Sequence, residues 1–204
     1  MIVKKITYND CLPFILNIHY ARRIPCIQYA FGLFDNDKLI GVCTFGQPAS
    51  PSLCKGIAGE TNRKNVLELN RLVLLPEHNG KNNSSILISK SLKMLPKNLF
   101  VVSYADIEGW GHVGYVYQAT NWLYTGKTKS RTNKYSDGHS RHYDKNETRR
   151  QYRTAKYRYV YLTGNKKKQL KELKYTVITP YPKGDNVKYD HNKPIPLNLR
   201  EDIT

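Results

Sequence analysis

Runs of apolar residues, separated by polar turns, divide the first 124 residues into short strands and helices. The runs YAFGLFD and KLIGVCTFG are rich in β-forming residues and are joined by a polar turn at residues 35–38, which predicts a β-hairpin. VLELNRLVLLP (66–76) predicts a strand that stops at a proline, and LFVVSYAD predicts a second buried strand. Between them, Ile88, Leu92 and Leu95 recur on one face of a helix. This order predicts an α/β (α+β) fold with a central mixed sheet flanked by helices.

The other apolar segments have less regular patterns. IVKKIT predicts a strand, and NDCLPFILNIHY predicts a short helix interrupted near Pro13. HVGYVYQATNWL predicts a helix, and YRYVYLT predicts a strand in a basic setting. The four cysteines show no C-x-x-C spacing, so we expect buried free thiols and a reducing compartment. The sequence contains no pattern typical of a signal peptide or a transmembrane helix, so we expect a soluble cytoplasmic protein without a membrane partner.

Positive charge is concentrated in one part of the chain. The net charge is +17, and residues 127–174 hold 16 Lys and Arg against 4 Asp and Glu, which is twelve of the seventeen charges. A field of this strength attracts polyanions, so we expect nucleic acid as a partner, although a solvated basic face is the alternative. In RRQYRTAKYRYVYL, basic and aromatic residues alternate at strand spacing. The residues that we expect to contact DNA are Arg149, Arg150, Arg153, Lys156 and Arg158.

The same composition suggests the division of the chain into parts. We expect one domain over residues 1–175, which includes the basic, tyrosine-rich segment 127–175, followed by a proline-rich, irregular tail at 176–204. We therefore expect a basic C-terminal extension of the fold.

The polar loop EHNGKNNSS lies between a predicted strand and a predicted helix, where ligands bind in α/β sheets. Backbone N–H groups and the helix dipole at such a place attract phosphate. An ordinary helix start with Ser84 or Ser85 as the N-cap explains the same residues equally well. The residues of the candidate cofactor site are Gly80, Lys81, Asn82, Asn83, Ser84 and Ser85.

Several motifs occur in an order that resembles the Mom proteins of Mu-like bacteriophages. They include IHYARRIP, ELNRLVLLP, SYAD, GHVGYVYQATNWLYTG and KYRYVY, and they run from His19 to Tyr161. The resemblance implies a single domain with the fold of the GNAT acetyltransferases, in which the loop after the fourth strand holds the pyrophosphate of the cofactor. It implies an enzyme that adds a carbamoylmethyl group to N6 of adenine in double-stranded phage DNA. This modification protects the DNA from restriction in the cytoplasm of the infected bacterium.

Adenine N6 is a poor nucleophile and is paired inside the duplex, so such an enzyme must flip the base out. Asp106 ends an apolar strand just before glycines, where a carboxylate is available as a general base, a metal ligand or a contact to the adenine amino group. The alternative for Asp106 is an N-cap of the next helix. Arg71 lies in an apolar strand and needs a partner there, such as Glu68, Asp106 or a phosphate. The resemblance adds Tyr117 as a proton donor and two further active-site residues, His19 and Tyr20.

Other roles and activities stay open at this stage. Trp110, Tyr115, Tyr117 and Trp122 are candidate surfaces for stacking on a flipped base. Core packing is the alternative for all four, and it is the favoured interpretation for Tyr115 and Trp122. The cofactor alternatives are acetyl-CoA, a related acyl donor, and iron held by His19 and Asp106 with a second histidine. A homodimer is one open oligomeric state. The alternative functions are a GNAT-type N-acetyltransferase acting on a protein or a small amine, and a non-catalytic DNA-binding protein.

Overall fold

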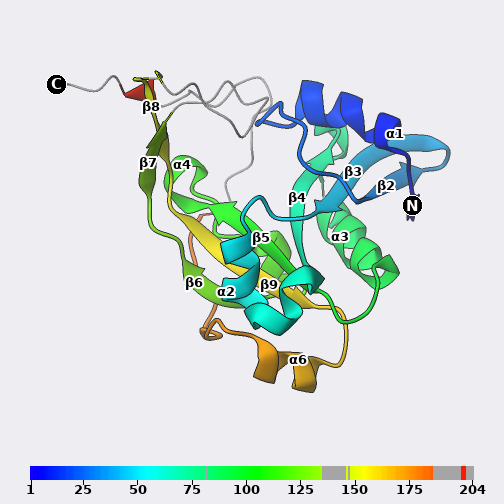
Figure 1. Ribbon diagram of the computed structural model, residues 1–204. Coiled ribbons are helices and arrows are strands. Elements are labelled where there is room, and N and C mark those ends of the chain that lie inside the picture. The colour runs from blue at the N-terminus through cyan, green and yellow to red at the C-terminus, as the bar shows by residue number, and fades with distance from the viewer. Residues whose placement is uncertain (81, 135–145, 147, 186–198, 201–204) are drawn as a thin grey trace.

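The computed structural model describes residues 1–80, 82–134, 146, 148–185 and 199–200 (Figure 1). Within these residues a seven-stranded sheet has the order β1-β2-β3-β4-β5-β9-β6, and its strands are antiparallel except for the parallel pair of β4 and β5. This mixed sheet confirms the predicted α/β fold. The strands are β1 (Ile2–Lys5), β2 (Tyr29–Asp35), β3 (Lys38–Gly46), β4 (Val66–Leu74), β5 (Phe100–Asp106), β6 (Leu123–Lys127) and β9 (Lys156–Leu162).

Helices cover both faces of the sheet (Figure 1). Side chains alternate between the faces along each strand: in β3, Val42 packs in the cluster of α1, and Cys43 packs in the cluster of α3. The elements on the first face are α1 (Tyr8–Pro13), its π-helical continuation η1 (Phe14–Ile18) and α2 (Pro51–Asn62); α3 (Asn83–Met94) and the short α5 (Tyr115–Gln118) lie on the second. The remaining helical elements are α4 (Ile107–Trp110), α6 (Lys166–Glu172) and the 3₁₀ turns η2 (Arg63–Asn65) and η3 (Pro76–His78).

The strands β4 and β5 part near the middle of the sheet. They pair at Val66–Glu68 opposite Phe100–Val102, and the pairing ends there. A β-bulge in β4 places Asn70 outside the ladder with β3, because Leu69 and Arg71 are opposite the consecutive residues of β3. The parting of two parallel strands opens the sheet at their carboxyl ends, where ligands bind in folds of this class.

A second sheet extends from the first. Among the described residues it has the strand order β10-β8-β7, with β7 (Arg131–Lys134), β8 (Arg150–Arg153) and β10 (Leu199–Arg200). Figure 1 shows β7 and β8 extending upwards beyond the main sheet. We call the antiparallel pair of β7 and β8 the basic ribbon. Its two strands carry Arg131, Lys134, Arg150 and Arg153, which are four of the 16 basic residues of segment 127–174.

The predicted helix HVGYVYQATNWL is wrong over most of its length. Its helical part is Tyr115–Gln118, and the chain then enters β6. The cause is local, because Gly114 before the helix and Asn121 after it both adopt the left-handed backbone conformation, with φ of 87° and 61°. Gly114 also lacks room for a side chain, since a Cβ atom there would lie 2.5 Å from the ring of Tyr159.

Three other predictions have different outcomes. The α-helix ends at Pro13, as predicted, but the chain does not leave the helical path there, because a π-helical turn continues it to Ile18. The strand predicted over YRYVYLT is confirmed as β9, which lies inside the main sheet between β5 and β6. All four cysteines are free, but Cys26 is exposed and the other three are buried.

The first part of the predicted tail packs against the domain. The backbone of Ile178 bonds to Tyr124 O at 2.9 Å, and the Tyr181 hydroxyl donates to Trp122 O at 2.6 Å. Most of the rest of segment 176–204 lies outside the described residues. The helices that the structure describes include none that is long and apolar enough to cross a membrane.

Candidate active site

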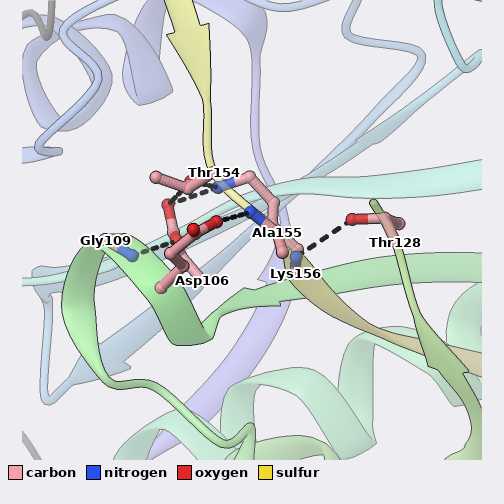
Figure 2. Close-up of polar contacts among 7 residues, drawn as sticks. Asp106, Gly109, Thr128, Thr154, Ala155 and Lys156 are labelled. Carbon is pink, nitrogen blue, oxygen red and sulfur yellow. Dashed lines mark hydrogen bonds and ion pairs between the residues drawn. The ribbon is translucent and has the colours of Figure 1, made fainter. Parts of the chain in front are cut away.

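Asp106 ends β5 and caps α4 (Figure 2). Its Oδ1 accepts a hydrogen bond from the backbone N–H of Gly109 at 2.8 Å, and its Oδ2 accepts one from the Thr154 hydroxyl at 2.9 Å. The ammonium group of Lys156 forms an ion pair with Oδ2, and the Asp106 side chain is 11% exposed. The N-cap interpretation is confirmed. The carboxylate is therefore bound by its own chain on both oxygens.

The neighbouring Glu108 connects α4 to the start of β9. Its carboxylate accepts a hydrogen bond from the Tyr152 hydroxyl at 2.8 Å and one from the backbone N–H of Ala155 at 2.5 Å. The bond from Ala155, then that from Tyr152, lowers the pKa of Glu108. Together with the contacts of Asp106 to Thr154 and Lys156, these bonds join α4 to the base of the basic ribbon. We call this set of contacts the ribbon junction.

His19 follows the π-helical turn and is 7% exposed. Its Nδ1 accepts a hydrogen bond from the backbone N–H of Ala21 at 3.0 Å, so the proton of the neutral ring lies on Nε2. Burial, and then the charge of Arg71, lowers the pKa of His19 to about 3. At neutral pH His19 is therefore an uncharged ring that donates through Nε2.

Aromatic rings extend from His19 to α4. The rings of His19 and Tyr20 have centroids 4.2 Å apart, and those of Tyr20 and Trp110 are 6.3 Å apart. Trp110 lies in α4, the helix that Asp106 caps. The structure thus brings the segment of His19 and Tyr20 to the helix that follows β5.

Arg71 lies just after the bulge in β4. Its guanidinium donates to the carbonyl oxygen of Arg23 from Nε (3.2 Å) and Nη2 (2.6 Å), and to the carbonyl oxygen of Asn70 from Nη1 (2.6 Å). The hydrogen-bonding partners of Arg71 are therefore backbone carbonyls. Burial lowers its pKa, and the nearby Tyr20 and Glu68 oppose this effect.

Tyr117 is buried on the second face of the sheet. A 2.8 Å hydrogen bond joins its hydroxyl to that of Ser103, which also lies 2.9 Å from Leu69 O. The Tyr117 ring packs against Trp122 and Tyr159, with both centroid distances at 5.2 Å. Burial raises the pKa of Tyr117, with smaller contributions from Tyr20 and Glu68, so the phenol keeps its proton at neutral pH.

Glu68 is a site residue that the sequence analysis considered only as a partner of Arg71. It is the last residue of β4 that pairs with β5, and it is half-buried. In the described part of the chain, no hydrogen bond or ion pair reaches its carboxylate. Burial raises the pKa of Glu68, and Arg71 partly offsets this. A glutamate in an apolar strand three residues before an arginine was the available signal.

The candidate phosphate loop begins α3 in a conformation that suits an anion. The N-cap is Asn82, with a left-handed φ of 66°, and not Ser84 or Ser85; its side chain makes no capping bond. The Asn83 side chain instead donates to His78 O at 2.8 Å, so the first-turn amides at Asn83, Ser84 and Ser85 have no side-chain cap. A Cβ atom at Gly80 would meet no atom within 4 Å. Lys81 lies outside the described residues.

The predicted metal site finds no support in the structure. The described residues contain no group of three or more His, Cys, Asp or Glu side chains arranged to hold a metal ion. Both oxygens of Asp106 accept hydrogen bonds, and His19 Nδ1 accepts one from Ala21.

The predicted DNA-contacting residues lie in different surroundings. Arg149, which is exposed, immediately precedes β8, and Arg150 and Arg153 lie within it. Lys156 is paired with Asp106. Arg158 donates to Thr125 Oγ1 (3.0 Å) and Thr125 O (2.7 Å), and its guanidinium lies 3.4 Å from the ring centroid of Tyr175.

The predicted stacking residues divide between core and surface. Trp122 is fully buried, as the core alternative predicted. Tyr115 is 38% exposed, so its assignment to the core was wrong; its hydroxyl donates to Gly184 O at 2.5 Å.

Arg71→Lys is expected to destabilise the protein by about 2 kcal/mol, because an ammonium group cannot reproduce the three bonds of the planar guanidinium. The segment that carries His19 and Tyr20 should loosen with it. Urea unfolding measures the first effect, and hydrogen exchange of residues 19–26 measures the second. The exposed Arg63, which pairs with Glu60, provides the control Arg63→Lys. Equal stability of the two variants would contradict the structural role of Arg71.

Comparison with proteins of known structure finds folds of the acetyltransferase type. An N-acetyltransferase from Staphylococcus aureus Mu50 is 15% identical, with a TM-score of 0.49 over 79% of this chain and 98% of that one. GphF, a GNAT-like decarboxylase in complex with isobutyryl-CoA, is 11% identical, with a TM-score of 0.48 over 80% of this chain and 100% of that one.

Sequence comparison identifies a nearer relative. The methylcarbamoylase Mom of Escherichia phage Mu is 34% identical over 117 residues, which is 55% of this chain and 48% of that protein. The chain thus matches about half the length of this relative. The sequence model of the Mom protein family matches residues 1–183 of the 204. The chain therefore belongs to the Mom protein family.

Proposed function

We propose that this protein transfers a carbamoylmethyl group to N6 of adenine in DNA and thereby protects phage DNA from restriction. The observation that carries the proposal is the family match over residues 1–183, together with a relative named as a methylcarbamoylase. The site described above supports it, because His19, Tyr20, Arg71 and Tyr117 surround the point where β4 and β5 part.

The substrate in this proposal is double-stranded DNA from which one adenine is flipped out. The net charge of +17 and the basic ribbon support a polyanionic substrate. The half-buried rings of Tyr20 and Trp110, 6.3 Å apart, suit contact with a flipped base.

The reaction forms a bond from N6 to the carbon of the incoming group, and one N6 proton leaves. Glu68 is the proposed acceptor of this proton, because its carboxylate has a raised pKa and no hydrogen bond or ion pair within the described chain. His19 donates a hydrogen bond through Nε2–H, and the protonated Tyr117 donates a proton to the leaving group. Arg71 holds the segment of His19 in place. Asp106 acts as a positioning residue through α4 and the ribbon junction.

Acetyl-CoA or a related acyl donor fits the residues at the start of α3. The uncapped amides of Asn83, Ser84 and Ser85, with the open space at Gly80, would hold its phosphates. To give a carbamoylmethyl product, the donor must carry the –CH2–C(O)NH2 unit with its leaving group on the methylene carbon, because attack of N6 on the thioester carbon of acetyl-CoA would give an N6-acetyl product.

Nucleoside mass spectrometry of plasmid DNA from cells that express the protein tests this function. Wild type is expected to yield modified adenosine. Tyr117→Phe should lower the yield at least tenfold, because the proton donor is lost. Tyr115→Phe, on the same helix but exposed, should leave the yield unchanged.

Three results would contradict the proposal. Soluble wild-type protein with unmodified nucleosides would refute DNA modification. Acetylation of a protein or a small amine in place of DNA would favour an N-acetyltransferase. If substitutions of Glu68, Tyr117 and Arg71 leave DNA binding unchanged, and no modified base is found in any DNA, the protein is a non-catalytic DNA-binding protein.

A further inference from the structure

The basic ribbon places two arginines directly opposite each other. In the antiparallel register of β7 and β8, Arg131 pairs with Arg153. Directly opposite residues point to the same side of a ribbon, with Cβ atoms about 5 Å apart, and like charges in this position are destabilising. Such an arrangement calls for an anion between or beside the two guanidinium groups.

A third arginine reaches the same region from a distant part of the sequence. Arg23 follows the candidate catalytic residues His19 and Tyr20, and Arg71 holds its backbone carbonyl at 2.6 Å. Burial, followed by the charges of Arg23 and Arg131, lowers the pKa of the half-buried Arg153. Arg153 is therefore within electrostatic range of both Arg23 and Arg131, and we call these three residues the arginine cluster.

The arginine cluster has no counter-charge in the part of the chain that the structure describes. The ion pairs there involve other basic residues, namely Lys38, Lys55, Arg63 and Lys156. No hydrogen bond of the described chain uses the guanidinium of Arg23, Arg131 or Arg153 as a donor. Partly buried positive charge without a partner is costly, so these guanidiniums are available to an anionic ligand.

We propose that the arginine cluster binds a backbone phosphate of the DNA strand that carries the target adenine. Guanidinium groups bind phosphate oxygens through paired, charge-assisted hydrogen bonds, and three of them, from β7, β8 and the segment of His19, suit one phosphodiester group. Arg131 and Arg153 belong to the basic ribbon and Arg23 belongs to the segment of His19, so one phosphate bound by all three would link the DNA-holding element to the candidate active site. This inference rests on the proposed function, which identifies the bound DNA strand as the one that carries the target adenine. It adds the site on the protein that holds this DNA strand.

Binding of a fluorescent duplex oligonucleotide to the full chain tests the site. Arg23→Gln and Arg153→Gln are each expected to weaken binding about fivefold to tenfold, and to reduce the slope of log K against log salt by about one. Lys167→Gln is the matched control, because Lys167 is exposed on α6 at the opposite end of the molecule from the ribbon (Figure 1). It should change the affinity by less than about twofold.

A thermodynamic cycle tests whether the two arginines share one phosphate. The double variant should bind only slightly more weakly than either single variant, because the second substitution removes a contact to a phosphate already released. A duplex with a neutral methylphosphonate at the contacted position should lose affinity for wild type but not for Arg153→Gln. Arg153→Lys, which keeps the charge, should restore part of the binding.

Different results would overturn the proposal. If Arg23→Gln and Arg153→Gln bind DNA as tightly as Lys167→Gln does, the proposed phosphate site is refuted. Unchanged DNA affinity with weakened binding of coenzyme A would assign the cluster to a cofactor phosphate. Unfolding is measured alongside, and Arg153→Gln is expected to keep or raise the melting temperature because it removes like-charge repulsion. These outcomes are separate from a failure of the proposed reaction, which would appear as unmodified adenine while the binding differences persist.

Discussion

Asp106→Ala is expected to lower the yield of modified adenine at least a hundredfold while the protein remains folded. The substitution removes the cap of α4, the bond from Thr154 and the partner of Lys156 at once. Loss of an N-cap costs about 1 kcal/mol, which the domain should tolerate. The larger effect is on geometry, because α4 carries Trp110 to Tyr20 and a shift of about 1 Å in a catalytic site costs about a hundredfold in rate.

Asp106→Asn separates the two contributions to this effect. Asparagine is as good an N-cap as aspartate, so α4 should keep its start, but Lys156 loses its charged partner. We expect stability close to wild type and an intermediate loss of modification. Urea unfolding and nucleoside mass spectrometry on the same preparations measure both. Full modification by a folded Asp106→Ala variant would contradict the positioning role.

Acidification is expected to remove a large part of the stability through His19. Its pKa is about 3 in the folded protein and 6.5 as a free side chain. Because the folded pKa is the lower one, the unfolded chain takes up the proton first. The stability that depends on neutral His19 is therefore fully present above pH 6.5 and is lost as the pH falls toward 3, by up to about 5 kcal/mol.

His19→Asn is the variant that isolates this effect. Its side-chain oxygen can accept the bond from Ala21 N–H, but the group does not titrate between pH 3 and 7. Between pH 7 and 4, wild type should lose about 3 kcal/mol more than the variant in urea unfolding. The difference between the two proteins removes the contribution of carboxyl groups such as Glu68, which titrate in both. Equal losses would show that His19 is not buried as a neutral ring.

Local patterns predicted much of the fold. The hairpin of β2 and β3, the end of β4 before Pro76, and the apolar face of α3 all follow from residues within about a dozen positions of one another. The same holds for Asp106 at the end of β5, where both the strand and the cap are local features. The helix α2 was missed although Ser50 and Pro51 form a regular N-cap and first position.

The features that the sequence did not predict depend on contacts between segments that are far apart in the chain. Lys156 was predicted to contact DNA, but it forms an ion pair with Asp106, fifty residues away, because β5 and β9 are neighbours. The electrostatic effect of Arg23 on Arg153 likewise depends on two segments more than a hundred residues apart. The neutral state of His19 depends on burial and on Arg71, neither of which any spacing of residues reveals.

The most direct test of DNA modification is the tandem mass spectrum of adenosine from DNA exposed to the purified protein or isolated from expressing cells. We expect a nucleoside that carries one carbamoylmethyl group in place of a hydrogen, with fragments that keep this group on the exocyclic N6 of the base. The signal should be absent from cells that express Tyr117→Phe at the same level, or reduced there at least tenfold. Unmodified adenosine in the presence of soluble wild-type protein, or a group attached elsewhere than N6, would contradict it.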